Sequence, residues 1–287
     1  MSARPPEAIP GSDSVLRQAQ SENFAVASRL LPRAVRQHLL AIYGFARLAD
    51  DIGDEAVGDR LELLDWLEAE LERAEHGDAT HPLLRRLTPT LSQRDLSLAP
   101  FRDLIEANRR DQVVHRYETF DDLVSYCRLS AAPVGRLVLS VLGQTGPQQL
   151  RLSDDVCIGL QLVEHIQDVA EDFAVGRVYL PQVDLRAFQC SEAELSASHA
   201  GRELRMVLRF EAARARRLLG AAAPLGRSLP LRFRIAVCGF AAGGLAALDA
   251  IERAGHDVLG RRPRPTGARL GLRLAATLAA TSAGRAL

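Results

Sequence analysis

The chain has 287 residues, of which 47% are apolar and 25% are charged, and this composition favours one large globular domain. Its formal net charge is zero, so no overall field attracts nucleic acid and no nucleic-acid partner is expected. All 36 basic residues are arginine, which excludes Schiff-base and pyridoxal chemistry on a lysine, and also the phosphate loop that requires one.

The predicted elements are helices, because apolar residues recur at helical spacing and no stretch alternates as a strand does. After Pro32, the first apolar face comprises Val35, Leu39, Ile42, Ala46 and Ala49. The next comprises Leu61, Leu64, Leu67 and Leu71. Dipeptides typical of loops follow at His81-Pro82, Thr88-Pro89 and Ala99-Pro100.

Later helices are predicted at about residues 102–118, 120–142, 192–220 and 230–258. Another is expected to begin at Ser153 or Asp154, which are good N-cap types, and to end at Gly176. The whole pattern predicts an all-α bundle. Small residues on the later helices, among them Gly239, Gly243 and Gly244, serve either to leave room for a ligand or to allow close helix packing.

The cysteines are scattered without a C-x-x-C pair, and the first 21 residues lack the apolar core of a secretory signal, so a cytoplasmic location is expected. The longest uncharged apolar run, from Ile235 to Leu248, is too short to span a bilayer as a helix. Residues 261–287 are rich in arginine and contain no acid. This tail has two interpretations, a disordered end or a peripheral contact with the anionic inner face of the membrane.

Two acidic stripes carry the functional signal, Asp50-Asp51-x-x-Asp54 and Glu164-x-x-x-Asp168-x-x-x-Asp172. Acids four residues apart on one helix face repel each other by a few tenths of a kcal/mol per pair, so a bound cation is one way to offset the repulsion. Zinc and di-iron motifs such as H-E-x-x-H and E-x-x-H are missing from the sequence. Carboxylates without histidine suit a hard ion such as Mg²⁺.

On a helical wheel each stripe borders the apolar side of its helix, in two bands: Tyr43, Arg47, Asp50 and Asp54, then Gln161, Glu164, Asp168 and Asp172. Helical bundles build metal sites from facing helices, so the simplest expectation sets both bands across one cavity with cations between them. Each feature also has an interpretation that involves no ligand. The acids can form a hydrated face, Arg47 can form an ion pair within its helix, and Arg177 can be a charge at a helix C-terminus. His38, His115 and His165 are interpreted as solvated or core residues.

These residues resemble the squalene/phytoene synthase family. The resemblance rests on NFAVASRLLP at residues 23–32, YGFARLADDIGDE at 43–55 and QLVEHIQDVAEDFAVGRVYLP at 161–181. Residues 22–24, YCRLSAAPVG at 126–135 and GRVYLP at 176–181 are most similar to its bacterial hydroxysqualene synthase branch. The resemblance to the family extends over residues from about 15 to 262.

The resemblance implies an all-α isoprenoid synthase bundle with a central apolar cavity, spanning residues 21–262 between a flexible N-terminus, 1–20, and the basic tail, 263–287. It implies Mg²⁺ bound by Asp50, Asp54, Glu164, Asp168 and Asp172. The catalytic set is Asp50, Asp54, Asp168, Asp172 and Arg47. Substrate-binding positions are Ser21, Asn23, Tyr43, Arg47, Gln161, Arg177 and Tyr179.

The reaction implied is ionisation of presqualene diphosphate, rearrangement of the cation and its capture by water to give hydroxysqualene, in squalene and hopanoid biosynthesis, with a partner synthase as a source of substrate. The absence of a dinucleotide fingerprint agrees with water capture rather than reduction. Glu164 and Ala132 depart from the asparagines common at these positions. The alternatives are head-to-head condensation of two prenyl diphosphates to squalene, dehydrosqualene or phytoene, and a non-catalytic lipid-binding subunit.

Overall fold

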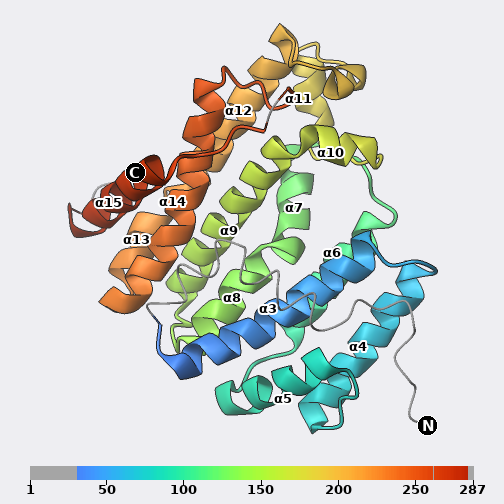
Figure 1. The fold of residues 1–287 in the computed structure, drawn as a ribbon, viewed down its shortest axis with the longest axis vertical. Coiled ribbons are helices and arrows are strands. Elements are labelled where there is room, and N and C mark those ends of the chain that lie inside the picture. Colours follow the sequence, from blue (N-terminus) through green and yellow to red (C-terminus); the bar gives the residue numbers. More distant parts are fainter. Residues whose placement is uncertain (1–30, 261, 284–287) are drawn as a thin grey trace. The chain divides into compact units, whose positions relative to one another are not determined.

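The structure is a computed structural model that describes residues 31–260 and 262–283 (Figure 1). The expected flexible N-terminus and the predicted substrate-binding residues Ser21 and Asn23 lie outside these residues. The chain divides into two compact units, which are described separately. Unit 1 runs to Val113 and includes Pro133–Gly146, whereas unit 2 comprises Val114–Ala132 and the chain from Pro147 onward. The described residues form helices without a β-strand, apart from an isolated bridge between Arg116 and Val178, so the all-α prediction is confirmed.

Unit 1 is a group of helices connected by short loops: α3 (Arg33–Asp54), α4 (Arg60–His76), α5 (Pro82–Arg94), α6 (Ala99–Asp111) and α8 (Ala132–Val141). Helix α3 packs against α4, α5 and α6. Of its predicted apolar face, Val35, Leu39, Ile42 and Ala49 are buried, whereas Ala46 is half-buried. Phe45, Leu48 and Ile52, which were not part of that prediction, are fully enclosed. Phe45 meets Phe101 of α6 edge to face at 5.0 Å between ring centroids, a favourable aromatic geometry.

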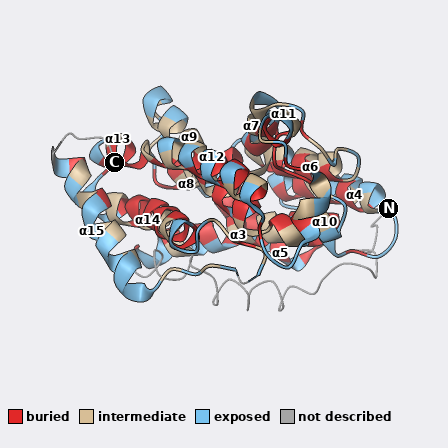
Figure 2. Ribbon diagram, turned by 90° about the horizontal axis from the view of Figure 1, so that it is seen from above, coloured by how far each residue is buried: buried red, intermediate tan, exposed pale blue. Residues whose placement is uncertain are grey.

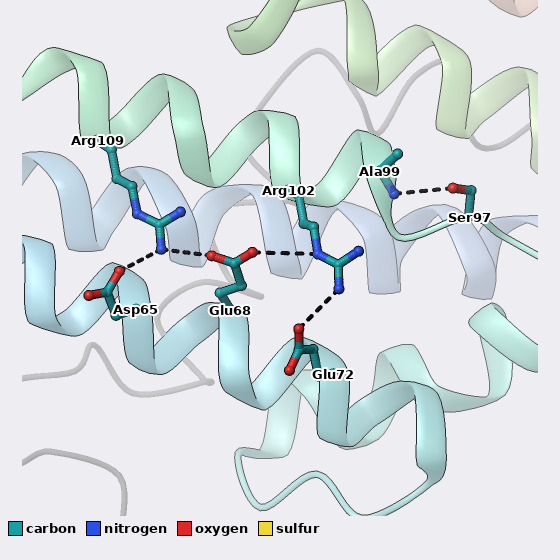
Figure 3. A network of polar contacts seen from close by, with 7 residues as sticks. All are labelled: Asp65, Glu68, Glu72, Ser97, Ala99, Arg102 and Arg109. Carbon is teal, nitrogen blue, oxygen red and sulfur yellow. Dashed lines mark hydrogen bonds and ion pairs between the residues drawn. The ribbon is translucent and has the colours of Figure 1, made fainter.

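Ion pairs join α4 to α6 at the surface of unit 1 (Figure 3). Arg109 Nη2 lies 2.6 Å from Asp65 Oδ1 and 2.7 Å from Glu68 Oε2. Arg102 pairs with Glu68 at 3.4 Å and with Glu72 at 3.0 Å, so Glu68 is shared by both arginines. Isolated surface pairs contribute about 0–1 kcal/mol, but a shared network orders both side chains and fixes how α6 lies on α4.

Unit 2 contains the remaining helices: α7 (Phe120–Ser130), α9 (Pro147–Gln167), α10 (Val169–Ala174), α11 (Gln182–Ala187), the 3₁₀ turn η1 (Glu192–Ser196), α12 (Arg202–Leu219), α13 (Ala222–Arg227), α14 (Leu231–Arg253) and α15 (Gly267–Ala283). Helix α9 packs against α7, α12, α13 and α14, and α15 packs against α13 and α14. In Figure 1, α15 accordingly runs beside α14 and α13.

Two glycines set the close approach of α9, α12 and α14. A Cβ atom on Gly244 would lie 2.8 Å from Leu160 Cδ2 and 3.1 Å from Leu219 Cδ1, and one on Gly159 would lie 3.1 Å from the backbone nitrogen of Leu219. By contrast, a Cβ on Gly239 or Gly243 would meet nothing within 4 Å. The structure therefore separates the two roles left open by the sequence: Gly244 serves helix packing, and Gly239 and Gly243 face open space.

A buried charged cluster joins α11 to α12 in unit 2. Arg214 forms ion pairs with Asp184 and, at 2.6 Å, with Glu211, and its guanidinium lies over the rings of Phe120 and Phe210 at 4.3 and 4.2 Å. Glu211 is only 2% exposed, and burial raises its pKa to about 7, with Asp184 adding to the effect and Arg214 opposing it. Two carboxyl groups therefore share one arginine, and burial favours the protonated form of Glu211.

Several predicted boundaries are wrong. Helix α5 was not expected, because Thr88-Pro89 indicated a loop, yet Pro89 lies inside α5. The predicted helix at 120–142 is divided into two helices, α7 and α8. The predicted helix at 192–220 is divided into the 3₁₀ turn η1 and the helix α12. The helix expected from Ser153 begins at Pro147 and breaks at Asp168 before resuming as α10. Gly176 does follow the helix end with φ of 86°, as predicted.

Within the described residues, one helix, α14, is long and apolar enough to cross a membrane, and 67% of its most apolar window is buried inside the protein. Figure 2 shows the same burial along α14. Helix α14 thus packs as a core helix. The tail, for which the sequence left disorder and membrane contact open, contains α15.

Candidate functional site

The first acidic stripe lies at the C-terminal end of α3, in unit 1. Asp50 and Asp54 are exposed, whereas Asp51 between them is 5% exposed. Unit 1 also contains a cavity of about 190 Å³. Its wall is formed by α3 and α8, through Leu39, Ile42, Tyr43, Ala46, Arg47, Asp50, Val134 and Val138. Three predicted site residues, Tyr43, Arg47 and Asp50, therefore share one cavity with an otherwise apolar wall.

The carboxyl of Asp50 is held in an environment that disfavours its negative charge. Although its side chain remains accessible to water, surrounding protein atoms reduce its hydration and raise its pKa to about 7. Asp54 and Asp51 raise this pKa further, whereas a hydrogen bond from Asn108 and the charge of Arg47 lower it.

Asn108 of α6 fixes the orientation of Asp50. Its Nδ2 donates to Asp50 Oδ1 at 3.3 Å and to the carbonyl of Leu104 at 3.1 Å. Gly53 allows this approach, because a Cβ there would lie only 2.1 Å from Asn108 Oδ1. One turn later, Gln112 Nε2 donates to the carbonyl of Gly53 at 3.0 Å. Helix α6 thus supports the acidic end of α3 through polar contacts that the sequence analysis did not identify.

Arg47 does form the intrahelical ion pair that the sequence left open. Its Nε lies 2.6 Å from Asp51 Oδ1, and its Nη2 lies 3.4 Å from Glu55 Oε1. Because Asp51 is buried, loss of hydration raises its pKa, and Arg47 opposes this increase. Asp51 therefore orients Arg47 along the cavity wall, and it leaves Asp50 and Asp54 as the accessible acids of the stripe.

The second acidic stripe spans the break between α9 and α10, in unit 2. Glu164 is exposed, and Asp168 and Asp172 are partly buried. Asp168 is the residue at the break, with φ of −104° and ψ of 17°. Two backbone hydrogen bonds continue through it, from Asp168 N to the Glu164 carbonyl at 2.9 Å and from Asp172 N to the Asp168 carbonyl at 2.8 Å. The helical spacing of the three acids is therefore preserved.

An aromatic cluster packs behind this stripe. His165 is 7% exposed, and its ring stacks on Tyr179 with centroids 3.8 Å apart and an angle of 15° between the ring planes. Tyr117 and Tyr126 complete the cluster around Tyr179. His165 also lies near the acids and Gln161: its Nδ1 is 3.9 Å from Asp172 Oδ2, and its Nε2 is 3.4 Å from Gln161 Nε2. His165 is thus a core residue, as interpreted, but one that contacts the acidic stripe.

The chain after α14 contacts Asp168. Arg262 Nη2 lies 2.8 Å from Asp168 Oδ1, and Gln167 Nε2 donates to the carbonyl of Pro263 at 3.3 Å. Reduced hydration raises the pKa of Asp168, an effect that Arg262 opposes and Asp172 reinforces. Arg262 was not predicted from the sequence, because its partner lies 94 residues away in the chain.

The turn that carries Arg177 is fixed by Arg116. The guanidinium of Arg116 donates to the carbonyls of His115 and Gly176 and pairs with Glu192 at 2.7 Å. Arg177 N donates to the carbonyl of Asp172 at 2.8 Å, and Val178 N donates to that of His115 at 2.9 Å. Arg116, which was also missed, therefore keeps Arg177 within one short turn of the second acidic stripe.

The donor set fits Mg²⁺. Each stripe offers carboxylate oxygens four residues apart, the hard donors that Mg²⁺ prefers. Within the described residues, no three His, Cys, Asp or Glu side chains form a complete site by themselves.

Comparison with known proteins gives consistent matches. A hydroxysqualene synthase of Sinorhizobium fredii is 38% identical over 237 residues, covering 79% of this chain and 78% of that protein. A phytoene synthase of Arthrospira platensis is 34% identical over 257 residues, covering 84% and 83%. The crystal structure of squalene synthase HpnC from Alicyclobacillus acidocaldarius shares 40% identity with a TM-score of 0.79, covering 89% of this chain and 95% of that one.

The all-helical fold and its similarity to a solved squalene synthase place the chain in the class of isoprenoid synthases. Residues 17–269 match the squalene/phytoene synthase family, and the chain belongs to this family, whose enzymes process isoprenoid diphosphates. The expectation drawn from the sequence resemblance is therefore confirmed at the level of fold and family. The individual roles of the site residues stay predictions.

Proposed function

We propose that this protein converts presqualene diphosphate into hydroxysqualene in a Mg²⁺-dependent reaction. The observation that carries the proposal is the cavity of unit 1, where Tyr43, Arg47 and Asp50 stand at the edge of an apolar wall. A substrate with a diphosphate group and a long hydrocarbon chain needs polar residues to bind the diphosphate and an apolar wall to bind the chain. The similarity to hydroxysqualene synthases over about four fifths of the chain supports the choice of substrate.

The reaction balances without a reductant. The bond from the cyclopropylcarbinyl carbon to the diphosphate oxygen breaks, and the diphosphate keeps both electrons. The cation rearranges with opening of the three-membered ring, and water then forms the new carbon–oxygen bond. The water loses one proton to the released diphosphate or to solvent, so the products are hydroxysqualene and diphosphate.

In this proposal the chain's polar residues bind the diphosphate and the metal. Asp50 and Asp54 at the end of α3 would hold Mg²⁺ in unit 1. Asp168, at the break between α9 and α10, and Asp172 of α10 would do so in unit 2, with Glu164 as a further oxygen donor. Bound Mg²⁺ supplies Lewis-acid stabilisation of the departing negative charge. Arg47 beside the first stripe and Arg177 after the second would each add fixed positive charge, a type of stabilisation that is usually the largest catalytic effect.

The apolar residues bind the hydrocarbon and exclude water from the early cation. Burial contributes about 0.8 kcal/mol per CH₂, and Leu39, Ile42, Val134 and Val138 provide such a surface in unit 1. The cavity of about 190 Å³ is smaller than the range of about 300–1,000 Å³ typical of ligand pockets, so it accommodates one part of the substrate. Gly239 and Gly243, which face open space in unit 2, are candidates for lining another part.

The test supplies presqualene diphosphate and farnesyl diphosphate in separate incubations and identifies the products by gas chromatography and mass spectrometry. Hydroxysqualene from the first incubation alone is expected. Condensation products from farnesyl diphosphate alone would instead support the second candidate, a head-to-head synthase, which the similarity to phytoene synthases favours. Binding of either compound without turnover would indicate a non-catalytic lipid-binding subunit.

Metal dependence is tested in the same assay. EDTA is expected to abolish turnover and added Mg²⁺ to restore it. The variants Asp50→Asn and Asp168→Asn, which keep the side-chain shape but remove the charge, should each lower kcat by at least 100-fold. Glu75→Gln, at an exposed position of α4 away from both stripes, is the matched control and should retain full activity. Substantial turnover in EDTA would exclude the metal-dependent mechanism.

A further inference from the structure

Helix α15 turns an apolar face toward solvent. The outer face of α15 comprises Ala268, Leu272, Ala275, Ala276 and Ala279, all of which are exposed. Leu272 lies near the middle of this face and is 69% exposed. Figure 2 shows this exposure along the helix. At 100° per residue these five positions span an arc of about 100°, which is the width of a typical buried stripe.

The opposite side of α15, which packs on α13 and α14, combines the partly buried Leu270, Leu274 and Leu278 with two buried threonines. Thr277 and Thr281 are 0% and 3% exposed. Their hydroxyls donate within the helix, to the Arg273 carbonyl at 2.8 Å and the Leu278 carbonyl at 2.6 Å. A surface helix normally buries its apolar side and exposes its polar side. Helix α15 instead carries apolar residues on both sides, so its outer face is suited to an apolar or interfacial environment.

The charge of this segment is of one sign. Residues 261–287 contain arginines and no aspartate or glutamate. Arg273 is neutralised by Asp249 of α14, with Nε 2.5 Å from Oδ2, and Arg262 by Asp168. Arg264 and Arg269 are exposed, and Arg269 lies on α15 one turn before Leu272. Positive charge thus borders the outer face of α15.

We propose that the outer face of α15 docks the protein reversibly on a bilayer that contains anionic lipids. Apolar side chains flanked by arginine suit the interface between headgroups and acyl chains. Each arginine near an anionic surface strengthens binding, and the attraction falls off within a Debye length. A second copy of the chain is a poorer partner, because two acid-free segments would bring like charges together. With a single leucine and four alanines, the apolar contact is small, so binding depends on charge.

The test is co-sedimentation of the full chain with vesicles of phosphatidylcholine alone, or with 30% phosphatidylglycerol. The wild type should bind the anionic vesicles and not the neutral ones, and binding should weaken as salt is raised. Leu272→Glu, and separately Arg264→Gln with Arg269→Gln, should lower the partition coefficient by roughly 20-fold. The matched control is Val113→Glu, which adds the same charge at a site that is 68% exposed, and it should bind more tightly than Leu272→Glu by a similar factor.

Four measurements decide the outcome. Urea midpoints of Leu272→Glu and wild type should agree, because a large loss of stability would mean that the protein itself covers this face. Sedimentation velocity should give the same mass for both, because self-association lost in Leu272→Glu would assign the face to a second copy. Equal binding of wild type and Leu272→Glu, or none to anionic vesicles, would also overturn the proposal. Turnover in detergent should be unchanged in Leu272→Glu, so failure of docking is distinguishable from failure of catalysis.

Discussion

Substitution of Gly53 by alanine should disturb the first acidic stripe without removing any of its charges. The new Cβ would lie 2.1 Å from Oδ1, 2.9 Å from Cγ and 3.2 Å from Cβ of Asn108, a side chain that is only 6% exposed. Asn108 must therefore move, and its hydrogen bonds to Asp50 and the Leu104 carbonyl weaken. Overpacking costs about 1–3 kcal/mol, and the weakened hydrogen bonds cost about 0.5–1.5 kcal/mol. The better helix propensity of alanine offsets about 1 kcal/mol, so we expect a net loss of about 0.5–3.5 kcal/mol.

Gly44→Ala is the matched control, because Gly44 lies on the same helix and a Cβ there would meet only Leu83 Cδ2, at 3.3 Å. Its gain in helix propensity is the same, so its free energy of unfolding should stay within about 1 kcal/mol of wild type. Both variants are compared by urea unfolding, where a change in midpoint at constant m reports stability. Gly53→Ala should also require more Mg²⁺ for half-maximal activity, because Asp50 loses its orienting contact. If the two variants have equal midpoints, the role assigned to Asn108 is wrong.

Gly244→Ala should destabilise the protein relative to Gly243→Ala by about 1–3 kcal/mol in urea, because only the former would press on Leu160 and Leu219; equal midpoints would contradict the packing role. A second prediction concerns pH. Burial raises the pKa of Glu211 to about 7, so between about pH 4.5 and 7 the folded state binds a proton that the unfolded state has released. This group's contribution to stability is therefore full below pH 4.5 and is lost as the pH rises through 7. Glu211→Gln should reduce the difference in urea midpoint between pH 5 and pH 8, and an unchanged difference would remove Glu211 as its source.

Local patterns predicted the fold wherever an apolar stripe was uninterrupted. The stripe of α3 places Val35, Leu39, Ile42 and Ala49 inside, as expected from a period of 3.6 residues. Helix α5 was missed because Thr88-Pro89 outweighed the buried leucines around it, although a helix tolerates the loss of one backbone hydrogen bond when its packing is good. No proline or glycine lies near the break at Asp168, so the sequence did not predict that the helix is interrupted there.

The sequence predicted the charged residues of the candidate site. It did not predict the residues that contact and orient them. Asp50 and Arg47 follow a recognisable spacing, and they do share a cavity with Tyr43. Asn108 lies 58 residues from the acid it orients, and an asparagine in a helix has no pattern that indicates such a partner. One indirect indication of the Arg262 contact is present in the sequence, because residues 261–287 contain arginines but no acid. An arginine in this segment can therefore form an ion pair only with an acid elsewhere in the chain, as Arg262 does with Asp168.

The contact between Arg262 and Asp168 has a practical consequence for the design of shortened proteins. A protein ending at Gly260 would lose α15 and, with it, the counter-charge of an acid proposed to bind the metal. Any drop in turnover after such a deletion would combine two unrelated defects in one measurement. Point substitutions within α15 leave the contacts of Arg262 with Asp168 and of Pro263 with Gln167 in place. They can therefore assign a phenotype to one cause, which truncation cannot do.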